Sequence, residues 1–294
     1  MTGELHILYS HVEVISPESA VDALEALDHY GESIRIVAGS TDISVMLKDA
    51  NLRESKFLDL SRLEGLRYIR VRQDGMIHIG ALATYGDCIR NRVLRKRARI
   101  LLDSVETIGS PQIRNLATLA GNLGNASPAG DAIPPLFVLD AKVVLQSRSE
   151  KREIPIEQFF SGYRKTVRKP NELIGEISFH PVKQDELTFF KKLGLRRANA
   201  VAVASVAFWG RREGDTFSRT RIALGAVAPT VVRARRAEEM LVGATLTPEK
   251  IREVAKTCAG ESSPISDLRG TATYRRHAVE ALAYIGLMDA VHAL

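Results

Sequence analysis

The chain has 294 residues, of which 45% are hydrophobic and 26% are charged, and its formal net charge is +6. These proportions are those of an ordinary globular protein, and they exclude a collagen-like chain, a disulfide scaffold and wholesale disorder. A chain of this length can bury a sizeable core and is long enough for two domains.

The first predicted elements are a helix and a short buried strand. Residues 16–18, Ser-Pro-Glu, are typical of a helix start, with a capping hydroxyl, a proline at the first helical position and an acidic first turn. This helix is expected to end near Gly31. Residues 34–38 predict the strand, which leads into the turn-type sequence 39–42, Gly-Ser-Thr-Asp, and then into an apolar segment at 43–47.

Two β-hairpins are predicted in the first half of the chain. Residues 68–72 and 76–80 alternate between apolar and polar side chains on either side of an Asp-Gly turn. Residues 142–146 and 152–156 form the second pair of strands.

A helix between the two hairpins is predicted from a capping box of Thr84 and Asp87, and it is expected to continue to about Leu102. It carries the densest basic cluster of the chain, Arg90, Arg92, Arg95, Lys96, Arg97 and Arg99. Aromatic residues make up only 6% and do not interleave with these side chains, so we interpret the cluster as a solvated helix face. A docking surface for an acidic partner protein is the main alternative, and nucleic-acid binding is a minor one.

The character of the sequence changes at a polar break over residues 181–186. We therefore expect a domain boundary at about residue 183, which gives one domain at 1–182 and another at 183–294. The elements predicted beyond the break are two strands and two helices, at residues 200–209, 219–227, 248–258 and 274–293. The fold class is α+β, because strands and helices are mixed on both sides of the boundary.

The two cysteines, Cys88 and Cys258, lie far apart, and there is no Cys-x-x-Cys. This chain alone is therefore not expected to hold an iron–sulfur cluster or a thiolate zinc site. Residues 1–10 do not have the pattern of a signal peptide. The longest apolar run, 200–209, has about half of the roughly 20 residues that a membrane span needs. We expect a reduced, cytoplasmic protein without a membrane span.

Two segments rich in glycine and small residues, 38–42 and 118–131, are the candidate binding elements. A pyrophosphate needs several backbone N–H groups that converge without side chains between them, and hydroxyl donors beside them. The glycines and hydroxyl residues that could meet this need are Gly39, Gly121 and Gly124 with Ser40, Thr41 and Thr118. The side chains that could bind a ribityl chain or a sugar are Asn122, Ser127 and Asp131. Neither the Rossmann glycine pattern nor a P-loop is present.

No acid, base or nucleophile stands out in the sequence. There is no Gly-x-Ser-x-Gly, and the seven histidines are scattered. His78 is expected to be a half-buried strand residue, and Cys88 a buried structural thiol. When the main feature of a protein is a possible cofactor-binding site, the bound cofactor is expected to carry out the reaction.

At these residues the chain resembles the medium, FAD-binding subunit of the molybdenum hydroxylases, a family that includes xanthine dehydrogenase and aerobic carbon monoxide dehydrogenase. The segments that carry the resemblance extend over nearly the whole chain, at 35–42, 112–122, 125–131, 162–166, 192–197 and 225–230. It implies the fold of the vanillyl-alcohol-oxidase type, in which two α+β subdomains, about 1–58 and 59–182 here, clasp FAD. A smaller C-terminal domain with a three-stranded sheet and helices follows.

The resemblance also implies a set of FAD-binding residues. The pyrophosphate loop would be Arg35, Ile36, Val37, Ala38, Gly39, Ser40, Thr41 and Asp42. The second lining segment would be Thr118, Leu119, Ala120, Gly121 and Asn122, with Asp131 in contact with the cofactor and Ser127 as the polyol candidate named above. Ile108 would lie against the adenine, and Ile174 and Lys192 near the flavin, where the Lys192 charge would favour the reduced anion.

Three positions differ from the pattern usual in the family. Ser40 and Ala120 stand where glycines are usual, so each needs a negative φ or extra room for its Cβ. Asn199 stands where many relatives carry aspartate.

The function implied is electron transfer. In this interpretation a large molybdenum-cofactor subunit and a small subunit with two [2Fe-2S] clusters are partners, in a dimer of heterotrimers. Electrons pass to FAD on this chain and then to NAD⁺, a quinone or O₂. The rival hypotheses are a self-sufficient flavoenzyme with its own small-molecule substrate, and a basic binding module without redox activity. The substrate of the whole enzyme stays open.

Overall fold

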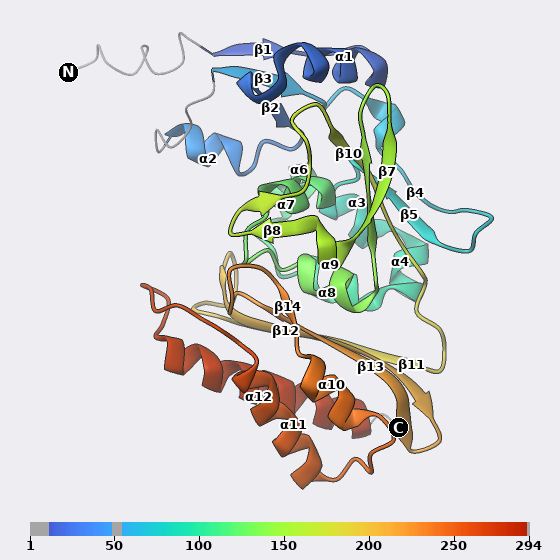
Figure 1. Ribbon diagram of the computed structural model, residues 1–294, viewed down its shortest axis with the longest axis vertical. Helices are drawn as coiled ribbons and strands as arrows, with labels where there is room; N and C mark the ends of the chain where they lie inside the picture. Colours follow the sequence, from blue (N-terminus) through green and yellow to red (C-terminus); the bar gives the residue numbers. More distant parts are fainter. Residues whose placement is uncertain (1–11, 49–54, 293–294) are drawn as a thin grey trace.

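The computed structural model describes residues 12–48 and 55–292, which form three larger sheets in chain order, each with its own helices, and one two-stranded sheet within residues 160–166 (Figure 1). The expectation that residues 1–10 carry no signal peptide lies outside the described residues, as does the end of the last predicted helix at Ala293. Within the described residues, no helix is long and apolar enough to cross a membrane.

The first unit is a small parallel sheet with strand order β1-β3-β2. Its elements are β1 (Glu13–Ile15), α1 (Ala20–Tyr30), the short 3-10 helix η1 (Gly31–Ser33), β2 (Ile34–Val37), α2 (Ile43–Lys48) and β3 (Lys56–Asp59). The predicted start of α1 was three residues too early. Ser19, not Ser16, caps the helix, in a reciprocal capping box with Asp22. The predicted end is confirmed, because Gly31 has a φ of +54°, which glycine adopts without strain.

The second unit is an antiparallel sheet of order β4-β5-β10-β6-β7. Its strands are β4 (Ile69–Val71), β5 (Ile77–Gly80), β6 (Lys142–Gln146), β7 (Lys151–Pro155) and β10 (Leu173–Phe179). Both predicted hairpins are confirmed. The central strand β10, which the sequence interpretation missed, is buried along its whole length.

Helices and a small hairpin pack around this sheet. They are η2 (Glu64–Leu66), α3 (Tyr85–Arg90), α4 (Arg92–Arg97), α5 (Arg99–Val105), α6 (Pro111–Leu116), α7 (Leu119–Asn125), α8 (Ile133–Val138), α9 (Ile156–Phe159), β8 (Phe160–Gly162) and β9 (Lys165–Thr166). Together with the sheet they enclose the largest apolar core of the molecule.

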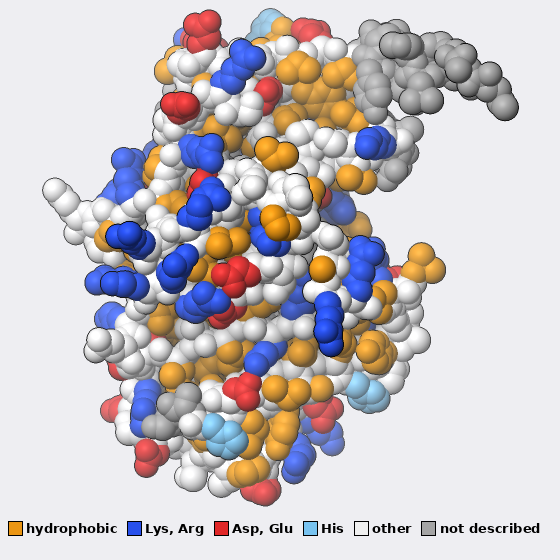
Figure 2. Space-filling model, turned by 180° about the vertical axis from the view of Figure 1, so that it is seen from behind, with side chains coloured by type: hydrophobic (Ala, Val, Ile, Leu, Met, Phe, Trp, Pro, Cys, Tyr) orange, Lys and Arg blue, Asp and Glu red, His pale blue; other side chains and the backbone are white. Residues whose placement is uncertain are grey.

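The helix predicted from Thr84 to Leu102 is three short helices. The Thr84–Asp87 capping box is present, but α3 ends at Asn91, whose side chain accepts hydrogen bonds from the N–H groups of Val93 and Leu94 and so starts α4. The basic residues of this stretch are exposed, as predicted. Figure 2 shows Lys and Arg side chains spread over the middle of the rear face, among acidic and apolar ones.

The third unit has strand order β11-β12-β13-β14, four strands where three were expected. The fourth strand has only two residues. The elements are β11 (Glu186–Gly194), β12 (Ala202–Glu213), β13 (Thr216–Gly225), β14 (Val232–Arg233), α10 (Arg235–Leu241), α11 (Pro248–Gly260) and α12 (Ala272–His292). The predicted hairpin and both long helices are confirmed.

The third sheet is covered on both faces, which explains the long apolar run in its sequence. Helices α10, α11 and α12 cover the face turned away from the second unit (Figure 1). The other face contributes Ala207, Trp209 and Ala223 to the core of the second unit. Nine consecutive residues of β12, Ala202 to Gly210, are therefore buried without alternation. The mixed α+β fold predicted from the sequence is what the structure shows.

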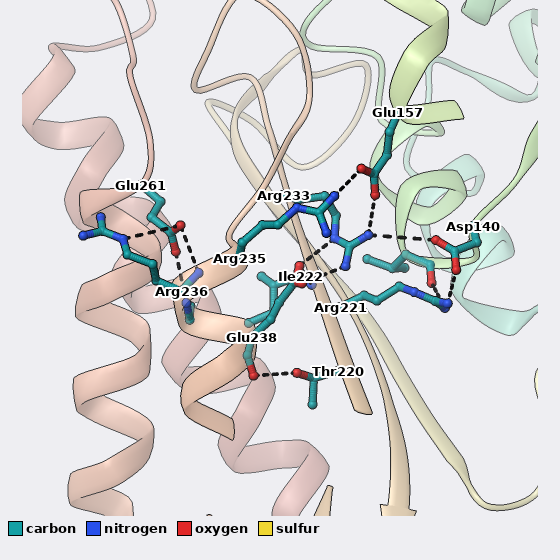
Figure 3. A network of polar contacts seen from close by, with 12 residues as sticks. Asp140, Glu157, Thr220, Arg221, Ile222, Arg233, Arg235, Arg236, Glu238 and Glu261 are labelled. Carbon is teal, nitrogen blue, oxygen red and sulfur yellow. Dashed lines mark hydrogen bonds and ion pairs between the residues drawn. The ribbon is translucent and has the colours of Figure 1, made fainter. Parts of the chain in front are cut away.

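A partly buried polar network joins the second and third units (Figure 3). Arg233 donates to both Glu238 oxygens at 2.6 and 2.7 Å and also to Glu157 of the second unit. Arg221 pairs with Asp140 and donates to the Val138 carbonyl at 3.0 Å. This network holds the C-terminal sheet against the second unit, and thereby sets one wall of the cavity described next.

Candidate functional site

A cavity of about 1230 Å³ lies where the three units meet. It is larger than most small-molecule sites, which range over roughly 300–1,000 Å³. The segments that line it come from every unit, at residues 31–46, 81–85, 108–131, 163–174, 199–202, 226–229 and 263–275. On the rear face, the surface is hollowed between α2 and the loop before α12 (Figure 2).

The loop after β2 approaches the second segment directly. A Cβ on Gly39 would lie 1.9 Å from the Leu116 carbonyl oxygen, so only glycine allows this contact. Within the described residues, no acceptor is found for the backbone N–H of Gly39 or Thr41. The two predicted segments therefore converge, and the first presents unpaired donors at the cavity.

Ser40 does not have the negative φ that was one of the two alternatives expected for its Cβ. Its φ is +58°, in the left-handed region. This conformation costs roughly 1–2 kcal/mol for a residue with a Cβ. The Ser40 hydroxyl lies 3.0 Å from that of Ser44, and the Ser44 N–H donates to the Ser40 carbonyl, so the first turn of α2 holds the loop in place.

The second segment is a capped helix rather than an open turn. Thr118 caps α7, and its Oγ1 accepts the Gly121 N–H at 3.0 Å. The amides of Gly121 and Gly124 therefore do not turn toward a ligand, contrary to the expectation. A Cβ added to Gly124 would lie 3.6 Å from Ile174 Cδ1, which is an ordinary contact distance. Leu119 is wholly buried and does not line the cavity.

Four buried polar atoms of the described cavity-lining residues have no hydrogen-bond partner. They are Asn122 Oδ1, Asp131 Oδ1, the Tyr85 hydroxyl and Arg275 Nε. A buried polar group without a partner costs about 1–3 kcal/mol, so four around one cavity indicate a site built for a ligand. Two of the atoms are acceptors, which suit ligand hydroxyl groups rather than phosphates.

A buried ion pair stands at the cavity wall. Lys192 Nζ of β11 lies 2.6 Å from Asp131 Oδ2, and the two side chains are 8% and 6% exposed. Burial raises the pKa of Asp131 to about 6, against the opposing effect of the Lys192 charge. Lys192 also donates to the Thr107 carbonyl at 3.3 Å and does not itself line the cavity. The Lys192 charge is therefore paired with Asp131 and is not directed unpaired into the cavity.

Positive charge is supplied from several sides of the cavity. Its lining includes Arg35, Arg164, Arg168 and Arg275. Arg164 donates to Asn125 Oδ1 at 2.9 Å from the turn between β8 and β9. Burial raises the pKa of Asp42, and the Arg164 charge opposes this rise. The sequence interpretation placed Arg164 in a family segment without a role and missed Tyr85, Arg168 and Arg275.

Most of the other predicted residues line the same cavity. Ile108, Ile174, Ala120 and Ser127 line the cavity, as does every residue of 35–42. Ser127 Oγ accepts the Ala129 N–H at 3.4 Å, which closes a local turn. Of the eighteen candidates, only Leu119 and Lys192 lie off the lining. The structure thus gathers two distant segments of the sequence around one space.

The residues set aside by the sequence interpretation lie elsewhere. His78 is buried rather than half-buried, with Nδ1 2.8 Å from Glu176 Oε1 and Nε2 3.0 Å from Asp74 Oδ2. Cys88 and Cys258 are free and buried in separate cores, and burial raises the pKa of Cys88 to about 12. In the part of the chain that the structure describes, no three His, Cys, Asp or Glu side chains could hold a metal ion.

Comparison with known proteins decides the family. The model of the FAD binding domain in molybdopterin dehydrogenase matches residues 10–181, and that of the CO dehydrogenase flavoprotein C-terminal domain matches 189–290. The chain belongs to this family. It is an oxidoreductase flavoprotein subunit of the molybdopterin dehydrogenases, and the resemblance seen in its sequence is confirmed.

Relatives of known function and solved structures agree with this assignment. The chain is 32% identical to the glyceraldehyde dehydrogenase medium chain of Sulfolobus acidocaldarius, over 93% of this chain and 95% of that one. It is 27% identical to the xanthine dehydrogenase FAD-binding subunit of Escherichia coli O157:H7, over 88% and 89%. Its fold matches a chain of carbon monoxide dehydrogenase from Hydrogenophaga pseudoflava with a TM-score of 0.91, at 28% identity over 96% and 97%.

Proposed function

We propose that this chain holds FAD in the central cavity and serves as the electron outlet of a molybdenum-containing dehydrogenase. The observation that carries the proposal is that two predicted FAD-binding segments, 38–42 and 118–131, both line one cavity. When bound, FAD supplies the redox chemistry, accepting electrons and passing them on by hydride or single-electron transfer. The residues of this chain bind it, orient it and balance its charge.

The pyrophosphate is assigned to the loop 38–42. The free N–H groups of Gly39 and Thr41 suit phosphate oxygens, which only accept hydrogen bonds. Arg35, Arg164 and Arg168 line the same cavity and offset the negative charge of the diphosphate. The acceptor atoms of Asn122 and Asp131 are assigned to hydroxyl groups of the dinucleotide.

The electron route extends beyond this chain. We propose that a small subunit with two [2Fe-2S] clusters delivers electrons from a large molybdenum-cofactor subunit, in a dimer of heterotrimers. The final acceptor is NAD⁺, a quinone or O₂. The cysteine content supports this proposal. A [2Fe-2S] cluster is held by four cysteine thiolates, whereas this chain has only the two buried thiols of Cys88 and Cys258.

We also propose to divide the chain as its sequence suggested. One FAD-binding domain covers 1–182, with subdomains at about 1–58 and 59–182, and a C-terminal domain covers 183–294. The first two sheets lie within 13–59 and 69–179, and the third lies within 186–233. FAD would then bind where all three sheets approach one another.

The test is reconstitution of the full-length chain with FAD. The holoprotein should show the flavin absorption band near ~450 nm. Titration by flavin fluorescence should give tighter binding of FAD than of FMN or riboflavin, because only FAD carries the whole dinucleotide. Arg164→Gln should weaken FAD but not riboflavin. A chain that stays colourless after incubation with excess FAD would refute the proposal.

The rival hypotheses make different predictions. A self-sufficient flavoenzyme would reduce its flavin with a small-molecule substrate in the absence of any partner. A basic module without redox activity would bind DNA or RNA with a strong salt dependence and leave flavin unbound. The unpartnered polar atoms around the cavity favour the FAD proposal over the latter.

A further inference from the structure

Tyr85 lines the cavity but belongs to neither predicted segment. It is the first residue of α3, directly after the capping residue Thr84. Its backbone N–H donates to the Ala117 carbonyl at 2.9 Å, and Thr84 forms a β-bridge with Thr118. These main-chain contacts fix the start of α3 against the start of α7.

The Tyr85 ring needs no hydroxyl for its packing. The residue is 1% exposed and sits in the main apolar core, where a phenylalanine of the same shape would pack as well. The hydroxyl is buried and has no hydrogen-bond partner. Such a group destabilises the free chain by the cost of its lost hydration, so its presence needs an explanation.

The surroundings of this hydroxyl determine what it can do. Burial raises the pKa of Tyr85 well above its usual value, and the charges of Cys88, Asp131 and Asp42 raise it further. The phenol is therefore protonated at any physiological pH and can donate its hydrogen. The same cavity presents two unpartnered acceptors, Asn122 Oδ1 and Asp131 Oδ1, but neither lies within hydrogen-bond distance of it.

A hydroxyl-bearing ligand would satisfy all three atoms together. A ligand hydroxyl oxygen accepts a hydrogen bond from a phenol while it donates its own hydrogen to an amide or carboxylate oxygen. A phosphate oxygen can only accept the hydrogen bond from the phenol, because it has no hydrogen to donate. The set of one donor and two acceptors therefore matches a chain of hydroxyl groups, as in the ribityl or ribose parts of a dinucleotide.

We propose that the Tyr85 hydroxyl donates a hydrogen bond to a hydroxyl group of the bound dinucleotide and, with Asn122 and Asp131, forms a polyol-binding subsite. This inference rests on the proposed function, since it takes FAD as the ligand. It assigns a binding role to a residue outside both glycine-bearing segments. It also predicts that the free chain bears a cost that the ligand removes.

The test is the variant Tyr85→Phe, measured both without and with FAD. The free variant should unfold at a higher temperature than the wild type, because it no longer buries an unpaired hydroxyl. Its dissociation constant for FAD should rise about tenfold, the equivalent of a hydrogen bond worth about 1.4 kcal/mol. The two effects have opposite signs, which a merely structural role of the hydroxyl would not produce.

The matched control is Tyr68→Phe. The Tyr68 hydroxyl donates to Glu176 on the second sheet, and Tyr68 does not line the cavity. This variant should lower the unfolding temperature and leave FAD affinity unchanged. A Tyr85→Phe variant with unchanged FAD affinity, or with a free chain less stable than the wild type, would overturn the inference alone. A wild-type chain that binds no FAD would overturn the proposed function and the inference with it.

Discussion

Replacing Gly39 with alanine tests whether the contact between the two segments positions the ligand. The backbone of Gly39 is one that an alanine can adopt, so the effect comes from the added Cβ alone. That atom would lie 1.9 Å from the Leu116 oxygen, against a normal minimum of 3.0 Å. The loop must therefore move by about 1 Å, and overpacking of this kind costs roughly 1–3 kcal/mol.

The free chain can relieve this strain by shifting the loop, whereas the bound state needs the loop in place. We therefore expect Gly39→Ala to weaken FAD binding roughly 10- to 100-fold, since each ~1.4 kcal/mol is tenfold. The assay is a fluorescence titration with FAD, with thermal unfolding to confirm the fold. Gly65→Ala is the control, because a Cβ there meets nothing within 4 Å. Wild-type affinity in Gly39→Ala would show that the loop is not part of the site.

Three further outcomes follow from the polar contacts. Arg233→Met leaves the buried Glu238 carboxylate without its charged partner and should lower the free energy of unfolding in urea by about 3–5 kcal/mol. The control Arg235→Met removes an exposed arginine and should lower it by less than about 1 kcal/mol. Equal losses of stability in the two variants would contradict the argument from burial. The pKa of Asp131 is raised to about 6 in the folded chain against about 3.9 when unfolded, so its contribution to stability is complete below about pH 4 and is lost as the pH rises through 6. Asp131→Asn should remove this pH dependence from urea unfolding, and an unaltered profile would speak against it. Asn91→Ala removes the cap of α4 and should lower the free energy of unfolding, measured by thermal unfolding, by about 1 kcal/mol. Asn91→Asp can still cap the helix and should retain most of the wild-type stability.

Local patterns in the sequence determined several of the elements. The Thr84–Asp87 capping box, the end of α1 at Gly31, both hairpins and the start of α11 after Thr247 are where the residues predict them. These signals depend on contacts within a few residues, so they survive in any fold. The two segments of the candidate site could be singled out from the sequence, because they are long and specific enough to resemble a known family.

Tertiary structure decided the features that depend on distant partners. The strand β10 is buried along its whole length, including the polar residues Glu176 and Ser178, because of its place at the centre of the sheet. The approach of Gly39 to the Leu116 carbonyl joins residues far apart in the chain, and Ser40 beside it has a positive φ. Tyr85 became a candidate only when burial and a missing partner were seen together, since no spacing in the sequence marks a hydroxyl that the folded chain leaves unpaired.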